Sequence, residues 1–368
     1  MTNAELLAEK KARLAKVIAL EKPDRTPVIL MEDSFCAVHM GVKLSDFCSS
    51  LKRENEVMVS SIKAMGPDVD GVTAPYGAGN LFPMVFGTKV KLPGKELPDD
   101  TLWQLDEKEM LTVDDYDTII DQGWGAFQRQ YLIEKLHYPL DSMLEQLGHT
   151  EQFVKNFEDA GYLVYSPLVA VTVNEQFGGG RSLSKFMRDL FKIPDKVEAA
   201  LDVIQAETMP GLREQIRAFK PQVVFLSPAR GASEFFSPKL WERFVWKYLK
   251  ATAEVIIEEG AAADIHCDGD WARDLEYFKE LPKARCIFET DGTTDIYKIK
   301  AVLGDHMAIK GDVSPVLTSL GTPDEVYAYA SKIIRDIGPE LILSSGCSLP
   351  PNAKVENVKA MISAATGK

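Results

Sequence analysis

The sequence lacks the features that mark several specialised classes of protein. No stretch reaches the ~18 apolar residues that a membrane-spanning helix requires, and residues Met1–Lys16 lack the apolar core of a signal peptide. The five cysteines are scattered and have no CxxC spacing, which disfavours a disulfide framework. No cluster of basic residues stands out. The chain has 42 Lys and Arg against 55 Asp and Glu, which gives a formal net charge of −13. We therefore expect a cytoplasmic protein that binds neither membranes nor nucleic acid.

Short apolar runs that alternate with long helical patterns are what the chain does contain. Strands separated by helices pair in parallel through right-handed crossovers. Eight such units predict an α/β protein of the (β/α)₈, TIM-barrel type. The expected strands are Pro27–Met31, Gly71–Ala74, Tyr162–Val169, Val223–Ser227, Ala262–His266, Arg285–Phe288, Met307–Lys310 and Leu341–Ser344.

The helical patterns and the composition between them predict one domain over residues 1–368, with an N-terminal helical extension at 1–24. Residues 76–115 are rich in Gly, Pro and acidic residues and have little periodicity. With the helical pattern that follows, they predict an elaborated insertion over 76–160, after the second strand. The expected helices are Leu51–Met65, Ile120–Leu136, Leu183–Leu190, Lys196–Phe219, Pro238–Glu259, Trp271–Phe278, Thr294–Leu303 and Thr322–Ile337.

A histidine and a cysteine far apart in the sequence are the strongest candidates for chemistry. His266 ends one predicted strand, and Cys347 follows the last one. In a parallel barrel, residues just beyond the strand ends converge on one face, and an imidazole with a thiolate is a plausible zinc site. On an extended backbone Asp268 projects to the same side as His266, whereas Cys267 projects to the other. The alternative is a structural histidine with a small buried thiol in a tight turn.

Other polar and aromatic residues lie beyond the strand ends and are weaker candidates. Glu289 follows the sixth strand and is a candidate metal ligand, general base or orienting partner of His266. Phe177–Arg181 is rich in glycine but lacks the spacing of a phosphate-binding loop, so we expect a mobile loop over the site. Glu32 and Asp33 end the first strand and Asp312 ends the seventh, which makes these acids candidates for catalysis. The candidates for substrate contacts are Tyr76, Asn174, Phe235 and Trp271.

Taken together, Ile265–Gly269, Lys310–Pro315, Gly321–Val326 and Gly346–Met361 resemble the uroporphyrinogen decarboxylase superfamily. The resemblance covers nearly the whole chain and implies a (β/α)₈ barrel. The decarboxylases of the superfamily carry arginines after the first strand, where this chain has Leu30–Phe35 with two acids. They also carry a histidine where this chain has Cys347. Both departures disfavour the decarboxylation of a substrate with many carboxylates.

The corrinoid-dependent methyltransferases of the superfamily are a closer match. Their His-x-Cys and distant Cys motif places zinc ligands at His266, Asp268 and Cys347, with Glu289 as a further candidate. The resemblance to the substrate-side methyltransferases of anaerobic O-demethylase systems implies zinc, a corrinoid protein as partner and a methoxylated aromatic substrate. The alternatives are a methyl transfer to a thiol, a decarboxylase and a non-catalytic binding barrel. The oligomeric state stays open, with a homodimer among the alternatives.

Overall fold

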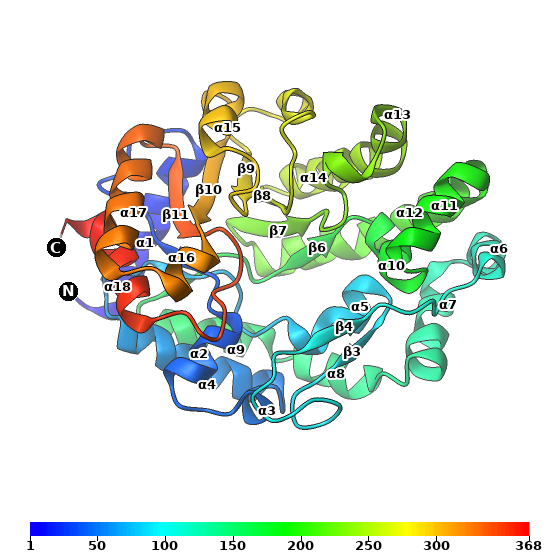
Figure 1. The fold of residues 1–368 in the computed structure, drawn as a ribbon, viewed down its shortest axis with the longest axis horizontal. Coiled ribbons are helices and arrows are strands. Elements are labelled where there is room, and N and C mark those ends of the chain that lie inside the picture. Colours follow the sequence, from blue (N-terminus) through cyan, green and yellow to red (C-terminus); the bar gives the residue numbers. More distant parts are fainter. Residues whose placement is uncertain (368) are drawn as a thin grey trace.

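Parallel strands form a barrel at the centre of the computed structural model, which describes residues 1–367 (Figure 1). Strands β6 to β11 form one parallel sheet, and β1, β2 and β5 form a second. A bridge between Val28 and Leu343 joins the two sheets on one side, and the chain itself runs from β5 into β6 on the other. The strands are β1 (Ile29–Leu30), β2 (Gly71–Val72), β5 (Leu163–Val164), β6 (Val169–Val171), β7 (Val223–Ser227), β8 (Ala262–Cys267), β9 (Cys286–Thr290), β10 (Ala308–Val313) and β11 (Leu341–Ser345).

The predicted barrel is therefore confirmed, with one change in its third strand. The expected strand Tyr162–Val169 divides into β5 and β6, with Ser166 and Pro167 between them. Pro167 has no N–H to donate to a neighbouring strand. The Ser166 hydroxyl takes over part of that pairing, because it accepts the N–H of Phe225 and donates to the carbonyl of Leu168. Each expected strand thus has a counterpart in the barrel.

Helices wrap the outside of the barrel, and both chain ends lie on the same side of it (Figure 1). Helix α4 (Leu51–Met65) has the expected bounds, and its N-cap Ser50 accepts the N–H of Arg53. The other longer helices are α1 (Asn3–Ile18), α6 (Val113–Gln122), α9 (Thr150–Asp159), α11 (Leu183–Lys192), α12 (Pro194–Phe219), α14 (Lys247–Glu258), α15 (Ile296–Leu303), α17 (Pro323–Ile337) and α18 (Val355–Thr366). None of the helices in the described part of the chain is both long and apolar enough to cross a bilayer.

The insertion after β2 carries regular structure of its own. Its helix α5 (Phe82–Phe86) is followed by an antiparallel hairpin of β3 (Lys89–Lys91) and β4 (Gln104–Asp106). The expected helix Ile120–Leu136 is interrupted, because Gly123, with a φ of +88°, separates α6 from α7 (Trp124–Gln130).

Two sequence-based expectations for local structure are wrong. Trp271–Phe278 does not form one helix: a turn precedes a short 3₁₀ helix at Leu275–Glu280, since Asp270 Oδ1 accepts the N–H of Ala272. The glycine-rich run is a buried helix, α10 (Asn174–Gly180), rather than a mobile loop. Its glycines allow a close approach of the insertion, because a Cβ at Gly179 would lie 1.9 Å from the carbonyl oxygen of Phe86.

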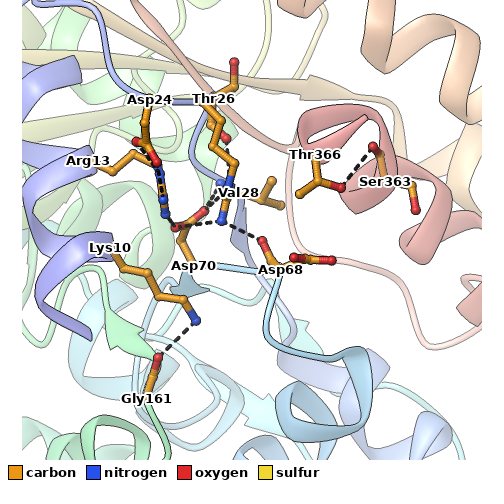
Figure 2. Close-up of polar contacts among 11 residues, drawn as sticks. Lys10, Arg13, Asp24, Thr26, Val28, Asp68, Asp70, Gly161, Ser363 and Thr366 are labelled. Carbon is orange, nitrogen blue, oxygen red and sulfur yellow. Dashed lines mark hydrogen bonds and ion pairs between the residues drawn. The ribbon is translucent and has the colours of Figure 1, made fainter. Parts of the chain in front are cut away.

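The N-terminal ends of the strands are closed by α1. Leu14 and Val17 of this helix pack against the first residues of the barrel strands in a buried cluster of their own. Beside it lies a buried ion cluster, which Figure 2 shows: Asp70 is fully buried and is paired with Arg13 and Arg25. Asp70 also accepts the N–H of Val28 at 2.8 Å. We call Arg13, Arg25 and Asp70 the lower ion cluster; it ties α1 to the start of β1 and the entry to β2.

Candidate functional site

Three side chains that the sequence singles out meet beyond the strand ends at the opposite face. His266 Nε2 lies 3.2 Å from Asp268 Oδ1 and 3.9 Å from Cys347 Sγ. One ligand atom from each residue lies within 4.8 Å of the other two. His266 is buried, whereas Asp268 and Cys347 are partly exposed, so the cluster is open on one side. We call these three residues the metal triad.

The backbone turns after β8 and β11 bring the triad together. Cys267 points into the core and is fully buried, as the alternation along a strand predicts. The chain then bends at Gly269, with a φ of +82°, and the indole N–H of Trp271 donates to the carbonyl of Asp268. On the other strand Gly346 packs so closely that a Cβ there would lie 2.5 Å from the carbonyl oxygen of Asp291. This contact holds the Cys347 loop against the loop after β9.

Behind His266 lies a buried line of charges. Glu289 Oε2 is 3.2 Å from His266 Nδ1, and Lys310 Nζ is 2.7 Å from Glu289 Oε1. Lys310 also lies 3.3 Å from Asp264. Glu289 faces the ring nitrogen of His266 that points away from Asp268 and Cys347, which is where a group that orients the imidazole would lie.

The charges in this line shift one another's pKa values. Burial disfavours a charged Glu289, but Lys310 and His266 outweigh it and hold its pKa at about 2. Burial raises the pKa of Asp264 to about 8, with a further contribution from Glu289. Burial alone would lower the pKa of His266, yet Glu289 and Asp268 raise it well above its usual range. The imidazole therefore lies between two carboxylates, Glu289 on one side and Asp268 on the other, and such surroundings favour positive charge at this position.

The metal triad lies on the wall of a cavity of about 250 Å³ inside the mouth of the barrel. That volume is near the lower limit for small-molecule sites. Most of the wall is apolar, and the insertion supplies part of it. Tyr76, Leu81, Phe82, Val85 and Phe86 line the cavity from the segment after β2, and Phe225 lines it from β7.

Two carboxyl groups from the end of β1 line the same cavity. Burial raises the pKa of Glu32 to about 8 and that of Asp33 to about 7, although Ser61 and the backbone N–H of Ala78 each oppose the shift. Among the described residues, Glu32 Oε2 and Asp33 Oδ1 have no hydrogen-bond partner. No Lys or Arg is among the described residues that line the cavity. We call Glu32 and Asp33 the upper acids.

The remaining sequence-based candidates lie elsewhere. Asp312 does not line the cavity: it accepts a hydrogen bond of 2.8 Å from the Tyr329 hydroxyl, against α17. Asn174 is buried in α10 beside Glu175, and Phe235 is 43% exposed outside the cavity. Trp271 is a fully buried core residue that supports the Asp268 turn. Of the four expected substrate contacts, only Tyr76 is among the residues lining the cavity.

Sequence reasoning missed several residues of the site. Lys310 and Asp264 lie inside predicted strands, where charged residues are rarely buried without a partner, so their presence there was a usable signal. No signal marks Phe86, since aromatic residues are mostly core and its place depends on how the insertion folds back.

The donor atoms of the metal triad fit a zinc ion. Nitrogen, sulfur and carboxylate oxygen are the ligands that zinc accepts. Ligands bound at ~2.0–2.3 Å in a tetrahedron lie roughly 3.3–3.6 Å apart. The separations of 3.2 and 3.9 Å in the triad lie close to that range.

Comparison with known proteins assigns the chain to a family. Residues 165–367, more than half of the chain, match the uroporphyrinogen decarboxylase family. The chain belongs to this family. Similar proteins include a uroporphyrinogen decarboxylase of Coxiella burnetii (strain Dugway 5J108-111), which is 24% identical over 178 residues, 48% of each chain. One from Pelodictyon phaeoclathratiforme is 34% identical over 241 residues, 62% of this chain and 64% of that protein.

The chain is also similar to proteins named for methyl transfer. A methylcobamide:CoM methyltransferase of Methanosarcina barkeri is 23% identical over 187 residues, 50% of this chain and 52% of that protein. The chain thus spans about half the length of several of these relatives. Among solved structures, a methyltransferase from Methanosarcina mazei superposes with a TM-score of 0.73 at 15% identity, covering 97% of this chain and 98% of that one. The fold of this family member is accordingly the (β/α)₈ barrel.

Proposed function

We propose that this chain is a zinc-dependent methyltransferase that moves the methyl group of a neutral methoxylated aromatic to the Co(I) of a separate corrinoid protein. The observation that carries the proposal is the position of the metal triad in the wall of a largely apolar cavity whose described lining has no Lys or Arg. His266, Cys347 and Asp268 would hold the zinc, and Glu289 would fix the imidazole from its other nitrogen.

The lining of the cavity argues for an uncharged substrate. Among the described residues the wall offers no Lys or Arg to a carboxylate or sulfonate. Glu32 and Asp33 would repel an anion whenever they ionise. Phe82, Phe86 and Phe225 offer aromatic faces on which a benzene ring can pack. A porphyrinogen with many carboxylates fits this wall poorly, although several relatives are named as decarboxylases.

Cleavage of an aryl methyl ether requires that the leaving aryl oxygen be stabilised and protonated, and residues of the cavity can do both. The methyl carbon forms a bond to cobalt as its bond to oxygen breaks, and the electron pair stays on the aryl oxygen. When bound, zinc supplies Lewis acidity that stabilises negative charge on this oxygen. A protonated Glu32 or Asp33 can give that oxygen its proton, because burial raises the pKa of Glu32 to about 8, so that it is mostly protonated at pH 7, and that of Asp33 to about 7, so that about half of it is.

Transfer of a methyl group to a thiol is the second candidate. It is favoured by the soft Cys347 ligand and by the relative named as a methylcobamide:CoM methyltransferase. The oxygen ligand Asp268 makes the site harder than one with two thiolates. The two candidates differ in the direction of methyl transfer.

A spectroscopic assay with a corrinoid protein distinguishes these candidates. Reduced Co(I) protein should change to the methylated spectrum when this chain and a methoxyphenol are added. A methoxybenzoate with the same ring, as the matched control, should react more slowly, because the described cavity wall offers its carboxylate no Lys or Arg and carries the two acids Glu32 and Asp33. Formation of Co(I) from the methylated protein on addition of a thiol would support the second candidate, and no reaction in either direction would contradict both.

A further inference from the structure

A chain of hydrogen bonds leads from the cavity to the outer part of the barrel. The Ser61 hydroxyl on α4 donates to Glu32 Oε1 at 2.9 Å. The same hydroxyl lies 2.9 Å from His39 Nδ1, at the end of α2 (Asp33–His39). Three side chains that are distant in sequence thus form one continuous path.

The two ends of this path lie in different surroundings. Glu32 is 1% exposed and lines the cavity, while Ser61 is fully buried. His39 is only partly buried and does not line the cavity. The second oxygen of Glu32, Oε2, has no partner among the described residues. Glu32 therefore has one oxygen engaged by the path and one that remains for a ligand.

The proposed function gives such a path a task. Each ether cleavage consumes one proton inside the cavity, and the corrinoid partner must cover the mouth of the barrel while the methyl group moves. Protons then need a route that does not pass through the mouth. We propose that His39, Ser61 and Glu32 form a proton relay that supplies the cavity from solvent; this inference rests on the proposed function.

The relay delivers one proton for each ether that is cleaved. Glu32 gives the proton on Oε2 to the aryl oxygen, which leaves as a phenol. The Ser61 hydroxyl passes its proton to Glu32 Oε1 and takes the proton of His39 Nδ1 in return, and His39 is reprotonated by solvent. Rotation of the Glu32 carboxyl then returns its proton to the cavity side. One proton moves from solvent to product, and no electron is transferred. Methyl transfer to a thiol releases a proton, for which the same path would run outward.

The groups around the relay suit this task. Phe35 stacks on the His39 ring at 5.4 Å between centroids, and burial together with Lys359 of α18 lowers the pKa of His39. A lowered pKa makes the imidazolium readier to give up its proton. Around Glu32 lie Cys36 and Asp33 of α2 and Tyr162 before β5, each of which prefers its neutral form in this environment.

Infrared spectroscopy of the full chain, with a corrinoid protein present to cover the mouth of the barrel, tests the relay without any substrate. Glu32→Gln should remove one band of a buried protonated carboxyl, which assigns that band to Glu32. In deuterated water the band should exchange about 10²-fold more slowly in His39→Gln and in Ser61→Ala, a factor typical of a lost proton-transfer group. The matched control Ser60→Ala removes the neighbouring exposed hydroxyl, which donates to the Glu56 carbonyl, and should exchange like the unchanged chain.

The results separate failure of the relay from failure of the proposed function. Unchanged exchange in both variants, or a Glu32 band absent from the unchanged chain, would overturn the relay. Slowed exchange that imidazole restores in His39→Ala would support it, even if no methoxylated aromatic reacts; in that case only the proposed substrate is wrong. If methyl transfer occurs, its rate in His39→Ala should recover with added imidazole.

Discussion

The two ends of the barrel bury carboxylates in opposite ways. At the lower ion cluster Asp70 is paired with two arginines and a backbone N–H (Figure 2). At the mouth, Glu32 is equally buried, but it accepts a hydrogen bond from the hydroxyl of Ser61 rather than from a cation, and no Lys or Arg is among the described residues that line the cavity. One carboxylate is neutralised by paired charge, and the other by holding a proton.

This contrast distinguishes a buried carboxyl group that stabilises the fold from a buried carboxyl group that is available for chemistry. In barrels of this kind the N-terminal ends of the strands serve stability, and the C-terminal ends carry the chemistry. A fully paired carboxylate has no capacity left for a ligand, whereas an unpaired acid costs stability and can exchange a proton. The position of the metal triad beside the upper acids follows the same division.

The largest effect is expected at the lower ion cluster. Asp70→Asn leaves Arg13 and Arg25 without their shared buried partner, so the free energy of unfolding should fall by about 3–5 kcal/mol. Denaturant unfolding measures it. Asp24→Asn is the control, because Asp24 pairs with Arg13 but is largely exposed, and it should cost less than about 1 kcal/mol. Equal losses of stability in the two variants would show that the buried pairing of Asp70 contributes no more than the exposed pairing of Asp24, and the lower end of the barrel would then not differ from the mouth in the way described.

A change of the opposite sign is expected at the mouth. The pKa of Glu32 rises from 4.5 to about 8 on folding, so between these values the native state binds a proton that the unfolded state has lost. Stability must therefore fall as pH rises through this window, by about 1.4 kcal/mol per pH unit at most. Glu32→Gln should remove this slope and stabilise the protein by roughly 3 kcal/mol near pH 7. Unfolding at several pH values measures it; an unaltered slope would show that Glu32 is ionised in the native state.

The smallest effect is expected at Asp312, which lies beyond a strand end like the upper acids but is paired with Tyr329. The catalytic role that the sequence suggests for this residue stays a prediction, although Asp312 lies outside the cavity lining. Asp312→Asn keeps an acceptor for the tyrosine, so it should cost about 1 kcal/mol and leave methyl transfer near its original rate. A large loss of methyl transfer with normal stability would support the catalytic interpretation.

The sequence predicted the barrel well because its strands are short, apolar and separated by helices with recognisable caps. His266, Asp268 and Cys347 were found for a related reason, since residues after parallel strands must converge. The aromatic wall was predictable only in part: Tyr76 and Phe82 were candidates to line a pocket, whereas Phe86 was not, because its place depends on how the insertion packs on α10. The glycines of α10 were misread as a mobile loop, although they serve a close approach of Phe86. Pairing of Glu289 with Lys310 likewise depends on register between β9 and β10.

Metal content is the measurement that tests the central claim most directly. The purified protein should carry one zinc ion per chain, and the double variant His266→Ala, Cys347→Ala should carry none. Cys267→Ala is the matched control, because this neighbouring thiol is buried in the core and points away from the metal triad, and it should keep its zinc. Full zinc in the double variant, or loss of zinc only in Cys267→Ala, would contradict the site described for this barrel.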